Sequence, residues 1–432
     1  MPISRVLIAN RGEIAVRIAR ACHKLGIETV LACSQADRFS LAARTVDRTV
    51  CIGPAQAGRS YLDQNAVITA ALGTRCDALH PGYGFLSERT SFRRLCDEAS
   101  VNFIGPSAEA IAAMGDKLTA LRLAKANEVP VIPGCEELKS ADDALREGRR
   151  IGFPVILKAS AGGGGRGMRV VRSPEKMHEA FVSAAAEARA AFGDATLYME
   201  KYVEKGRHIE VQIFGDSLGN ILHLGERDCT VQRRHQKLIE EAPSPVVDAK
   251  LRESLAASAV KLARAASYVG AGTVEFIMDL ESRSCYFLEM NTRIQVEHPV
   301  TEEVTGVDLV AEQIRVAGGE PLSFSQRDVK MPRHAIECRV NAEDVQAGFA
   351  PCPGEILKWE QPEGSGVRVD THCFAGYTVP PFYDSMLAKL VVCGDDRHAA
   401  IEGMLSALDR FVVEGVHTTI AFSRAIVSDD DF

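Results

Sequence analysis

The sequence predicts a mixed α/β and α+β fold in three parts, because three stretches of the chain carry different patterns. Residues 1–112 alternate short apolar runs with helical periodicity, which is typical of an open parallel sheet covered by helices. Residues 113–330 place a glycine-rich loop after an apolar strand and continue with several β-rich segments. Residues 331–432 carry turn residues at short intervals, which favours a mostly β domain capped by helices.

The N-terminal part begins with a β-α-β unit. Residues 5–9 form a short apolar run, Gly12–Lys24 repeats apolar residues at helical spacing, and residues 28–32 are apolar and β-rich again. The turn after the first strand contains only Gly12, whereas a dinucleotide-binding G-x-G-x-x-G loop needs three glycines. We therefore expect an open, Rossmann-like sheet without a nicotinamide dinucleotide site.

The composition excludes several classes of protein. The formal net charge is −8, from 50 Lys+Arg and 58 Asp+Glu, which gives no electrostatic reason to expect general binding to nucleic acid or to an anionic membrane. The twelve cysteines lie at least eleven residues apart, so no CxxC pair is present to start a zinc site or a redox dithiol. No apolar stretch reaches the roughly 18 residues of a membrane span, and the N-terminus lacks a signal-peptide core. We expect a cytoplasmic protein with reduced cysteines.

A glycine-rich loop is the strongest local signal in the central part. The apolar strand predicted at residues 154–159 contains Lys158, and five of the six residues at positions 162–167 are glycine. Glycines allow backbone N–H groups to close around phosphate oxygens, and a lysine at the end of the strand adds a positive charge. The loop lacks the G-x-x-x-x-G-K-[ST] pattern of a Walker A motif. Taken alone it would fit a flexible linker equally well, but the preceding strand and lysine favour phosphate binding.

Residues 286–297 combine carboxylates, amides and a guanidinium at alternate positions. If the chain stays extended there, one face presents polar side chains and the other presents apolar side chains to the core. The polar face would consist of Glu289, Asn291, Arg293, Gln295 and Glu297, and the core face of Met290, Ile294 and Val296. A solvated strand face is the alternative, but these residue types together suit metal and oxyanion binding better.

A second strand predicted at residues 272–279 precedes this segment and is separated from it by a polar turn. The two strands should form a hairpin in which Glu275 faces Glu289. Two carboxylates and the amide oxygen of Asn291 are hard ligands that suit Mg²⁺. The hairpin therefore predicts a magnesium site.

Three further clusters are weaker signals. His208, Glu210 and Gln212 would share one face of a strand, although a half-exposed edge strand would have the same pattern. Residues 232–237 hold three positive charges and a histidine, a composition that on its own indicates solvated surface. Residues 80–88 form a glycine-flanked aromatic turn at the end of a strand, where open sheets bind ligands, although an ordinary tight turn would look similar.

Long segments in a fixed order resemble the biotin carboxylases over nearly the whole chain. They are residues 8–15, 80–88, 114–117, the glycine loop, residues 226–229 with 232–237, and residues 289–297. The resemblance implies an N-terminal domain at 1–112, an ATP-grasp domain at 113–330 whose lid covers about 130–203, and a C-terminal domain at 331–432. It also implies that ATP and bicarbonate carboxylate the N1′ atom of biotin through carboxyphosphate.

The resemblance also implies roles for individual residues. Glu297 would be the general base, with Lys237, Arg293 and Arg339 as further catalytic residues. Bicarbonate would contact Lys237, Arg293, Gln295, Val296 and Glu297, and biotin would contact Tyr83 and Arg339. Two Mg²⁺ ions, with Mn²⁺ as a possible substitute, would be held by Glu275, Glu289 and Asn291. The residues assigned to ATP are Lys117, Lys158, Gly163, Gly164, Gly165, Gly167, Glu200, Lys201, Val203, His208, Gln232, His235, Glu275, Ile277 and Glu289.

The resemblance further implies partners, because the chain contains no Ala-Met-Lys-Met biotin attachment sequence and no carboxyltransferase region. A biotin carboxyl carrier protein or domain and a carboxyltransferase component would supply them, and the family implies a homodimer or a larger complex. Two alternatives stay open from the residues. One is a different bicarbonate-activating ATP-grasp ligase, such as one that makes carbamoyl phosphate. The other is a non-catalytic nucleotide-binding module of a larger assembly.

Overall fold

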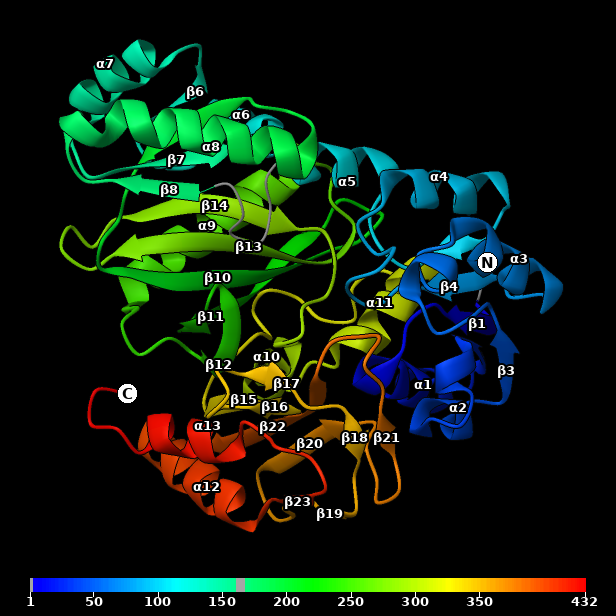
Figure 1. Cartoon of the computed structure of the whole chain (residues 1–432). Coiled ribbons are helices and arrows are strands. Elements are labelled where there is room, and N and C mark those ends of the chain that lie inside the picture. The colour runs from blue at the N-terminus through cyan, green and yellow to red at the C-terminus, as the bar shows by residue number, and fades with distance from the viewer. Residues whose placement is uncertain (1–2, 161–167) are drawn as a thin grey trace.

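The computed structural model describes residues 3–160 and 168–432, and it has the predicted mixture of α/β and α+β structure (Figure 1). The N-terminal residues, drawn in blue, form a separate lobe beside the central strands, and the C-terminal residues, drawn in orange and red, lie below them. All twelve cysteines are free thiols, as expected. Within the described ranges, no helix is both long and apolar enough to cross a membrane.

The N-terminal lobe is built on a parallel sheet of five strands in the order β3-β2-β1-β4-β5. The strands are β1 (Arg5–Ile8), β2 (Glu28–Cys33), β3 (Arg48–Cys51), β4 (Ala78–His80) and β5 (Asn102–Phe103). Its helices are α1 (Gly12–Lys24), α2 (Leu41–Thr45), α3 (Gln64–Gly73), α4 (Thr90–Glu98) and α5 (Ala108–Gly115), with 3₁₀ turns η1 (Gln35–Asp37) and η2 (Ala57–Arg59). This is the predicted open sheet, and the predicted bounds of α1 agree with the structure.

Local chemistry explains where several helices begin. The side chain before the first helical residue accepts a hydrogen bond from the third backbone N–H of the helix, which satisfies a donor that the helix leaves free. Such caps are Ser40, Asp63, Ser107 and Asp116, the last before α6 (Lys117–Ala126). Gly12 starts α1 at a φ of +69°, a conformation that side chains disfavour, so the turn after β1 depends on glycine.

An antiparallel sheet of eight strands forms the centre of the molecule, in the order β14-β13-β10-β11-β12-β15-β22-β20. Its strands are β10 (Gly206–Gly215), β11 (Ile221–Arg233), β12 (Gln236–Ala242), β13 (Gly270–Asp279), β14 (Cys285–Asn291), β15 (His334–Asn341), β20 (Val367–Thr371) and β22 (Met386–Gly394). Helices α9 (Ala249–Ala265), α10 (His298–Thr305) and α11 (Leu309–Ala317) pack against its strands. Because β12 pairs with β15, one sheet runs from the central part of the chain into the C-terminal part.

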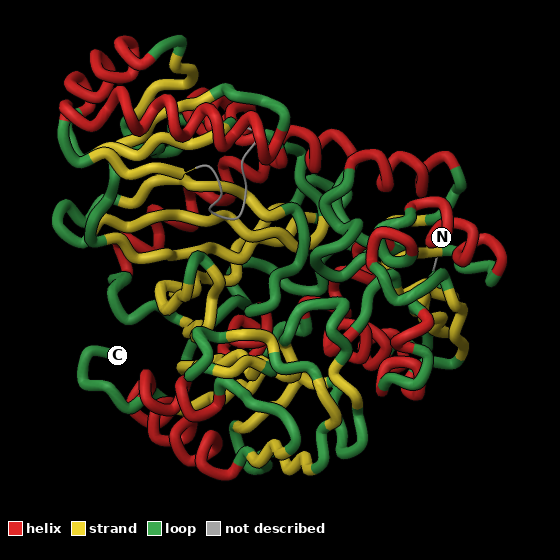
Figure 2. Tube along the Cα trace, in the orientation of Figure 1, coloured by secondary structure: helices red, strands yellow, loops and turns green. Residues whose placement is uncertain are grey.

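A smaller antiparallel sheet has the order β6-β9-β7-β8. Its strands are β6 (Gly134–Leu138), β7 (Val155–Ala159), β8 (Met168–Val171) and β9 (Leu197–Lys201), and it carries α7 (Ala141–Ile151), η3 (Pro174–Lys176) and α8 (Met177–Phe192). Figure 2 shows these helices on the outer side of the strands. The buried residues of this unit, among them Leu157, Met177 and Leu197, form a hydrophobic core of their own.

The C-terminal part is mostly β and is capped by helices, as predicted. Beyond the strands that it adds to the large sheet, it forms short pairs from β16 (Glu343–Asp344), β17 (Ala350–Pro351), β18 (Gly354–Glu355), β19 (Lys358–Glu360), β21 (Thr378–Val379) and β23 (Val412–Glu414). Helices α12 (Arg397–Arg410) and α13 (Ile420–Val427) pack against the strands. The predicted domain boundaries at 112/113 and 330/331 stay predictions.

The predicted alternation through residues 289–297 is wrong beyond Asn291, where β14 ends. Strand β13 offers Asn291 its last pairing partner in Thr273, and the next backbone N–H, of Thr292, binds the Glu88 carboxylate instead. The chain then turns into α10, with Glu297 immediately before its first residue. As a result Val296 is only half-buried rather than in the core, whereas Met290 and Ile294 are buried as expected.

Two local interpretations also change. Strand β10 lies between β11 and β13, so His208, Glu210 and Gln212 belong to a central strand and not to an edge. Residues 232–237 form the tip of the β11–β12 hairpin, where the Lys237 side chain is only 12% exposed, so this segment is more than solvated surface.

Candidate active site

A cleft of about 810 Å³ lies between the small sheet and the large sheet. The small sheet contributes Lys158 and Glu200, and the large sheet contributes the β13–β14 hairpin. Gly163, Gly164, Gly165 and Gly167, which the sequence assigns to ATP binding, lie outside the described residues. The cleft is lined by the other predicted site residues: Tyr83, Lys117, Lys158, Glu200, Lys201, Val203, His208, Gln232, His235, Lys237, Glu275, Ile277, Glu289, Asn291, Arg293, Gln295, Val296, Glu297 and Arg339.

Lys237 is the centre of the charged network on the side of this cleft that the large sheet forms. Its Nζ lies 2.6 Å from Glu210, 3.0 Å from Glu275 and 2.6 Å from Glu297. Burial alone would lower the pKa of Lys237, but these three carboxylates raise it well above its usual value. The lysine is therefore a fixed positive charge that holds three carboxylates together.

Glu297 is completely buried and is held by two cations. Lys237 Nζ donates to its Oε1 at 2.6 Å, and Arg339 Nη2 donates to its Oε2 at 2.9 Å. Burial would raise the pKa of Glu297, but Lys237 and Arg339 lower it well below its usual value. The carboxylate is therefore ionised and has no proton of its own, while its two cations make it a weaker base than an unpaired carboxylate.

Arg293 connects the cleft to the aromatic turn of the N-terminal lobe. Its Nε donates to Glu88 Oε2 at 2.8 Å, and its Nη2 donates to Asn291 Oδ1 at 2.9 Å. Tyr83, in the same turn as Glu88, lines the cleft and hydrogen-bonds to Glu13 through its hydroxyl group. The turn at residues 80–88 is therefore part of the site rather than an unrelated tight turn.

Glu275 and Glu289 face each other across the β13–β14 hairpin, as the sequence predicted. Asn291 Nδ2 donates to Glu275 Oε1 at 2.9 Å. Burial and the neighbouring Glu275 raise the pKa of Glu289, a repulsion that a divalent cation between the two carboxylates would relieve. The donor set, two carboxylates and an amide oxygen, fits Mg²⁺.

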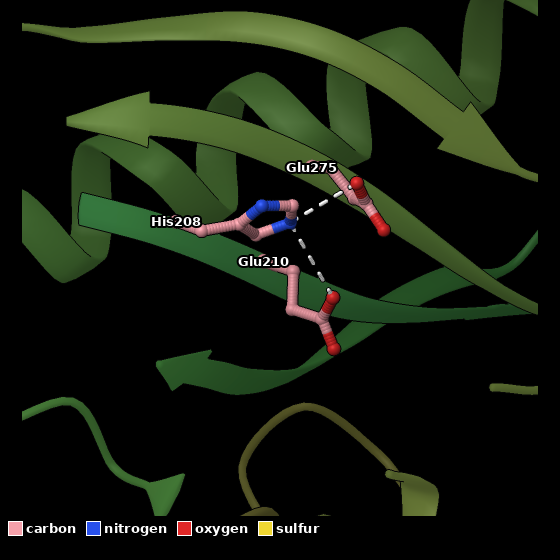
Figure 3. Close-up of side chains that lie close together, drawn as sticks. All are labelled: His208, Glu210 and Glu275. Atoms are coloured by element: carbon pink, nitrogen blue, oxygen red, sulfur yellow. Dashed lines mark ion pairs between the residues drawn. The ribbon is translucent and has the colours of Figure 1, made fainter. Parts of the chain in front are cut away.

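His208 lies beside this pair on β10. Its Nε2 is 3.0 Å from Glu275 on the neighbouring strand and 4.0 Å from Glu210 on its own strand (Figure 3). The three side chains offer ligand-type atoms within 4.8 Å of one another. However, Lys237 and Arg227 already contact Glu210, so positive side chains fill the position that a metal would take there. The Glu275–Glu289 pair of the hairpin therefore fits a metal ion better than this cluster does.

The remaining nucleotide-side residues lie around the rim of the cleft. Lys158 pairs with Glu200 across the small sheet, and Lys117 Nζ lies 3.9 Å from Glu289. Gln232 Nε2 lies 3.1 Å from His208 Nδ1, which joins the β11–β12 hairpin to β10. Lys201 donates instead to the backbone carbonyls of residues 152 and 153 at 2.9 and 3.0 Å.

Sequence reasoning missed two buried cations of the large sheet next to the cleft. Arg227 is fully buried and binds Glu210, and its Nη1 donates to Gln212 at 2.8 Å. The alternation at residues 208–212 could have identified Glu210 as an inward carboxylate. Lys389, from β22, donates to the Val296 carbonyl at 2.9 Å and lies 3.2 Å from Glu13. No local pattern could have identified Lys389, because its partners are far away in the sequence.

Three family models match the chain. Residues 2–111 match the N-terminal domain of biotin carboxylase, residues 337–432 match its C-terminal domain, and residues 116–325 match the ATP-binding domain described for the carbamoyl-phosphate synthase L chain. The order of the three matches supports the three-part fold that the sequence predicted.

Relatives match over the whole chain. The biotin carboxylase of Nostoc sp. is 51% identical over 100% of this chain and 97% of its own length. Biotin carboxylase 1 of Bacillus subtilis is 50% identical over 100% of this chain and 96% of its own length. The biotin carboxylase of Haemophilus influenzae is also 50% identical, over 100% of this chain and 96% of its own length.

Solved structures agree with these relatives. The biotin carboxylase of Campylobacter jejuni, described as a β,γ-ATP complex, superposes with a TM-score of 0.96 at 48% identity and covers 100% of this chain and 96% of its own. The biotin carboxylase domain dimer of Hydrogenobacter thermophilus 2-oxoglutarate carboxylase, described with MgADP, ADP and bicarbonate, has a TM-score of 0.94 at 46% identity, covering 100% and 95%. The chain belongs to the biotin carboxylase family.

Proposed function

We propose that this chain catalyses the ATP-dependent carboxylation of biotin with bicarbonate, which yields N1′-carboxybiotin, ADP and phosphate. The observation that carries the proposal is the buried Glu297 carboxylate, held between Lys237 and Arg339 at one end of the cleft that the Glu275–Glu289 pair also lines. An ionised base beside two cations suits the activation of a small anion next to a phosphate site. The relatives named biotin carboxylase support the same chemistry.

ATP would occupy the part of the cleft between the two sheets. The phosphates would contact Lys117, Lys158 and His208 and the glycine loop. The adenine would lie near Glu200, Lys201, Val203 and Ile277, and the ribose near Gln232 and His235. All of these side chains outside the glycine loop line one cleft, which supports a single nucleotide site. The solved relative described as an ATP complex is consistent with this placement.

Glu275, Glu289 and Asn291 would hold two Mg²⁺ ions, which Mn²⁺ could replace. The metal ions would offset the negative charge of the phosphates and keep the γ-phosphoryl group in position for transfer. The hairpin register that places the two carboxylates opposite each other supports this role. Because Lys237 and His208 contact Glu275, they set the orientation of its carboxylate before the nucleotide enters.

The carboxylation would proceed in two steps within the same cleft. Bicarbonate, held by Lys237, Arg293, Gln295 and the backbone of Val296, would give its proton to Glu297 and attack the γ-phosphoryl group, so that ADP leaves and carboxyphosphate forms. Carboxyphosphate would then split into CO₂ and phosphate, and the phosphate would take the proton from biotin N1′. Arg339 would stabilise the negative charge that develops on the ureido oxygen, and Tyr83 would contact the biotin ring. The biotin nitrogen would finally attack CO₂.

The proposed reaction requires a biotin that reaches the cleft from outside this chain. We infer a biotin carboxyl carrier protein or domain and a carboxyltransferase component as partners. We also infer a homodimer or a larger complex, which is supported by the solved relative described as a dimer of biotin carboxylase domains.

Bicarbonate-dependent ATP hydrolysis, measured with and without free biotin at excess Mg²⁺, tests the proposal. We expect biotin to stimulate turnover, and we expect Glu297→Gln and Arg339→Ala to remove the stimulation. ATP binding without turnover would contradict the proposal and favour a non-catalytic nucleotide-binding module.

A second arm of the experiment replaces biotin with ammonia. The central segment matches a model described for carbamoyl-phosphate synthase, so a ligase that transfers the activated carboxyl group to ammonia is a specific alternative. Turnover that requires ammonia and ignores biotin would favour that alternative. The biotin carboxylase models on both sides of this segment are the reason that we expect biotin to be the acceptor.

A further inference from the structure

Two buried carboxyl groups lie behind Arg339, and the reaction scheme above does not use them. Glu240 on β12 and Glu337 on β15 are direct partners in the strand register, and both are fully buried. Arg339 follows Glu337 by two residues on the same strand and pairs in register with Lys389 on β22. Helix α10, whose first turn Glu297 precedes, packs against all three of these strands.

Arg339 is shared between two carboxylates. Its Nε donates to Glu240 Oε1 at 2.7 Å, and its Nη2 lies 2.6 Å from the same oxygen. The same Nη2 donates to Glu297 Oε2 at 2.9 Å. Among the described residues, none of the hydrogen bonds of Arg339 uses Nη1, so that edge of the guanidinium is available to a ligand in the cleft. Glu240 therefore determines which edge of Arg339 is available.

In Glu240, the structure pairs one carboxylate oxygen, Oε1, with a hydrogen-bond donor. The other oxygen, Oε2, and both carboxylate oxygens of Glu337, are buried without a hydrogen-bond partner within residues 3–160 and 168–432. An unpaired buried carboxylate is costly, so such groups tend to keep a proton. Burial raises the pKa of Glu240 to about 7 against the opposing effect of Arg339, and it raises the pKa of Glu337 well above its usual value. Glu240 thus changes charge near neutral pH, whereas Glu337 stays neutral.

The charged groups around Glu240 come from every element that packs against it. Lys237 lies on its own strand, Glu297 precedes α10, and Glu337 and Arg339 lie on β15. The buried thiols of Cys229 on β11 and Cys338 on β15 also face it, and burial raises the pKa of both thiols, so they stay neutral. The charge of Glu240 therefore competes with one other anion, Glu297, for the guanidinium of Arg339.

We propose that Glu240 is a positioning residue for biotin carboxylation, which holds Arg339 by its Nε edge and so limits the pairing of Arg339 with Glu297. This inference rests on the proposed function. When Glu240 is ionised, it draws positive charge away from Glu297, which then binds a proton more readily, and it fixes Arg339 with Nη1 free for the ureido oxygen of biotin. When Glu240 is protonated, Arg339 pairs mainly with Glu297 and weakens it as a base.

The pH dependence of biotin-stimulated ATP turnover in Glu240→Gln tests the proposal. The ionised form is the more active one, so wild-type kcat should rise with pH through a midpoint near 7. Glutamine keeps an oxygen acceptor but never becomes charged, so the variant should lack this rise. We expect kcat about tenfold below wild type at pH 8 and a much smaller difference at pH 6, since a charge-assisted hydrogen bond is roughly twice as strong as a neutral one, a difference that changes an equilibrium constant about tenfold. KM for ATP should not change.

Glu241→Gln is the matched control. Glu241 is the next residue on β12, is buried, and pairs with His334 at 2.8 Å and with Arg397 at 2.7 Å, outside the cleft. The Glu241→Gln variant tests whether the loss of any buried ion pair on β12 is enough to change the pH profile. We expect the wild-type profile in this variant, and a loss of the rise near pH 7 would contradict the role of Glu240.

The outcomes separate the inference from the proposed function. If the wild-type protein shows no biotin-stimulated turnover, the proposed function fails. If wild type is active and Glu240→Gln has the same pH profile, only the inference about Glu240 fails. If Glu240→Gln does not fold, Glu240→Asp replaces it, because aspartate keeps the charge on a shorter side chain. The Asp variant should keep the rise with pH at a lower maximum, and a flat profile in folded Asp protein would overturn the proposal.

Discussion

The two sheets that enclose the cleft differ in how they hold their charged side chains. In the large sheet, strands β10–β15 carry positive side chains that each contact more than one carboxylate. Lys237 contacts three carboxylates, and Arg339 bridges two. We call these strands the floor. We call the small sheet and its helices, residues 134–160 and 168–201, the cover; within the described residues, the ion-pair partner of Lys158 there is the single carboxylate Glu200.

This difference separates two tasks. Shared partners fix each side chain from several directions, which suits groups that must meet a small anion at one position. The cover faces the nucleotide side of the cleft and has a hydrophobic core of its own, so it can adjust without disturbing the floor. The chemistry of the site is therefore concentrated in a rigid sheet, while the cover supplies charge and enclosure.

The largest effect should come from Glu297, the proposed base. Glu297→Gln keeps one oxygen acceptor, whereas the carboxylate offers one oxygen to Lys237 and one to Arg339, and it cannot take a proton from bicarbonate. We expect biotin-stimulated ATP turnover to fall on the order of 1,000-fold, and the melting temperature to fall as well because two buried cations lose their shared carboxylate. Steady-state kinetics alongside thermal unfolding check this prediction. A fall of less than tenfold would mean that the floor only positions bicarbonate and that another group takes the proton.

Replacing Arg227 tests whether the stability of the floor depends on side chains that contact several partners. This fully buried guanidinium contacts Glu210, Gln212, Thr273 and Thr301. Arg227→Met leaves the Glu210 carboxylate buried with less compensation, and we expect the free energy of unfolding to fall by about 3–5 kcal/mol. Denaturant unfolding measures this change. A loss as small as that of a surface variant would show that Lys237 alone is sufficient to hold Glu210.

Leu157→Ala tests whether the cover has a hydrophobic core that is independent of the floor. Leu157 is completely buried in the separate core of the small sheet, and its truncation leaves a cavity. We expect a local loss of about 2–4 kcal/mol. Hydrogen exchange should accelerate in residues 134–160 and 168–201 and stay unchanged in β10 and β13. Equal acceleration in both sheets would contradict the idea that the cover has an independent core.

The smallest effect should come from an exposed ion pair between Arg172 of the cover and Glu204, which lies just after it. Arg172 and Glu204 are 65% and 51% exposed and contact each other beside Tyr202. Solvent screens such pairs, so Arg172→Met should leave both the unfolding midpoint and the biotin-stimulated turnover at wild-type values. This variant is the surface control for Arg227→Met. A clear shift of the midpoint would show that charge pairing matters as much in the cover as in the floor.

Local patterns predicted the elements whose causes are local. The apolar residues at helical spacing predicted the helix Gly12–Lys24 correctly, and the polar turn between two β-rich segments predicted that Glu275 would face Glu289. The alternation failed after Asn291, where the chain leaves β13 and the backbone N–H of Thr292 binds the carboxylate of Glu88, a residue far away in the sequence. A period-two pattern describes a strand only while the chain stays paired with its neighbour.

Contacts between distant segments could not be predicted in the same way. Glu240 and Arg339 meet because β12 pairs with β15, and Lys389 reaches Val296 because β22 pairs with β15. Each of these residues looks like an ordinary charged side chain in its own segment. Their burial depends on a sheet assembled from both the central and the C-terminal parts of the chain. The resemblance of ordered motifs pointed to Arg339, which lines the cleft, but it did not point to Glu240 and Glu337.

The pairing of β12 with β15 also has a consequence for the synthesis of the protein on the ribosome. Strand β12 leaves the ribosome well before β15, so until then the central sheet has an open edge with unpaired backbone groups and the Glu240 side chain uncovered. An open edge of this kind invites pairing with other nascent chains, a hazard that chaperones counter. Arg339, which contacts the proposed base Glu297, arrives on β15, the strand that covers this edge. The site therefore receives Arg339 in the same step that covers the edge of β12, before β22 extends the sheet further.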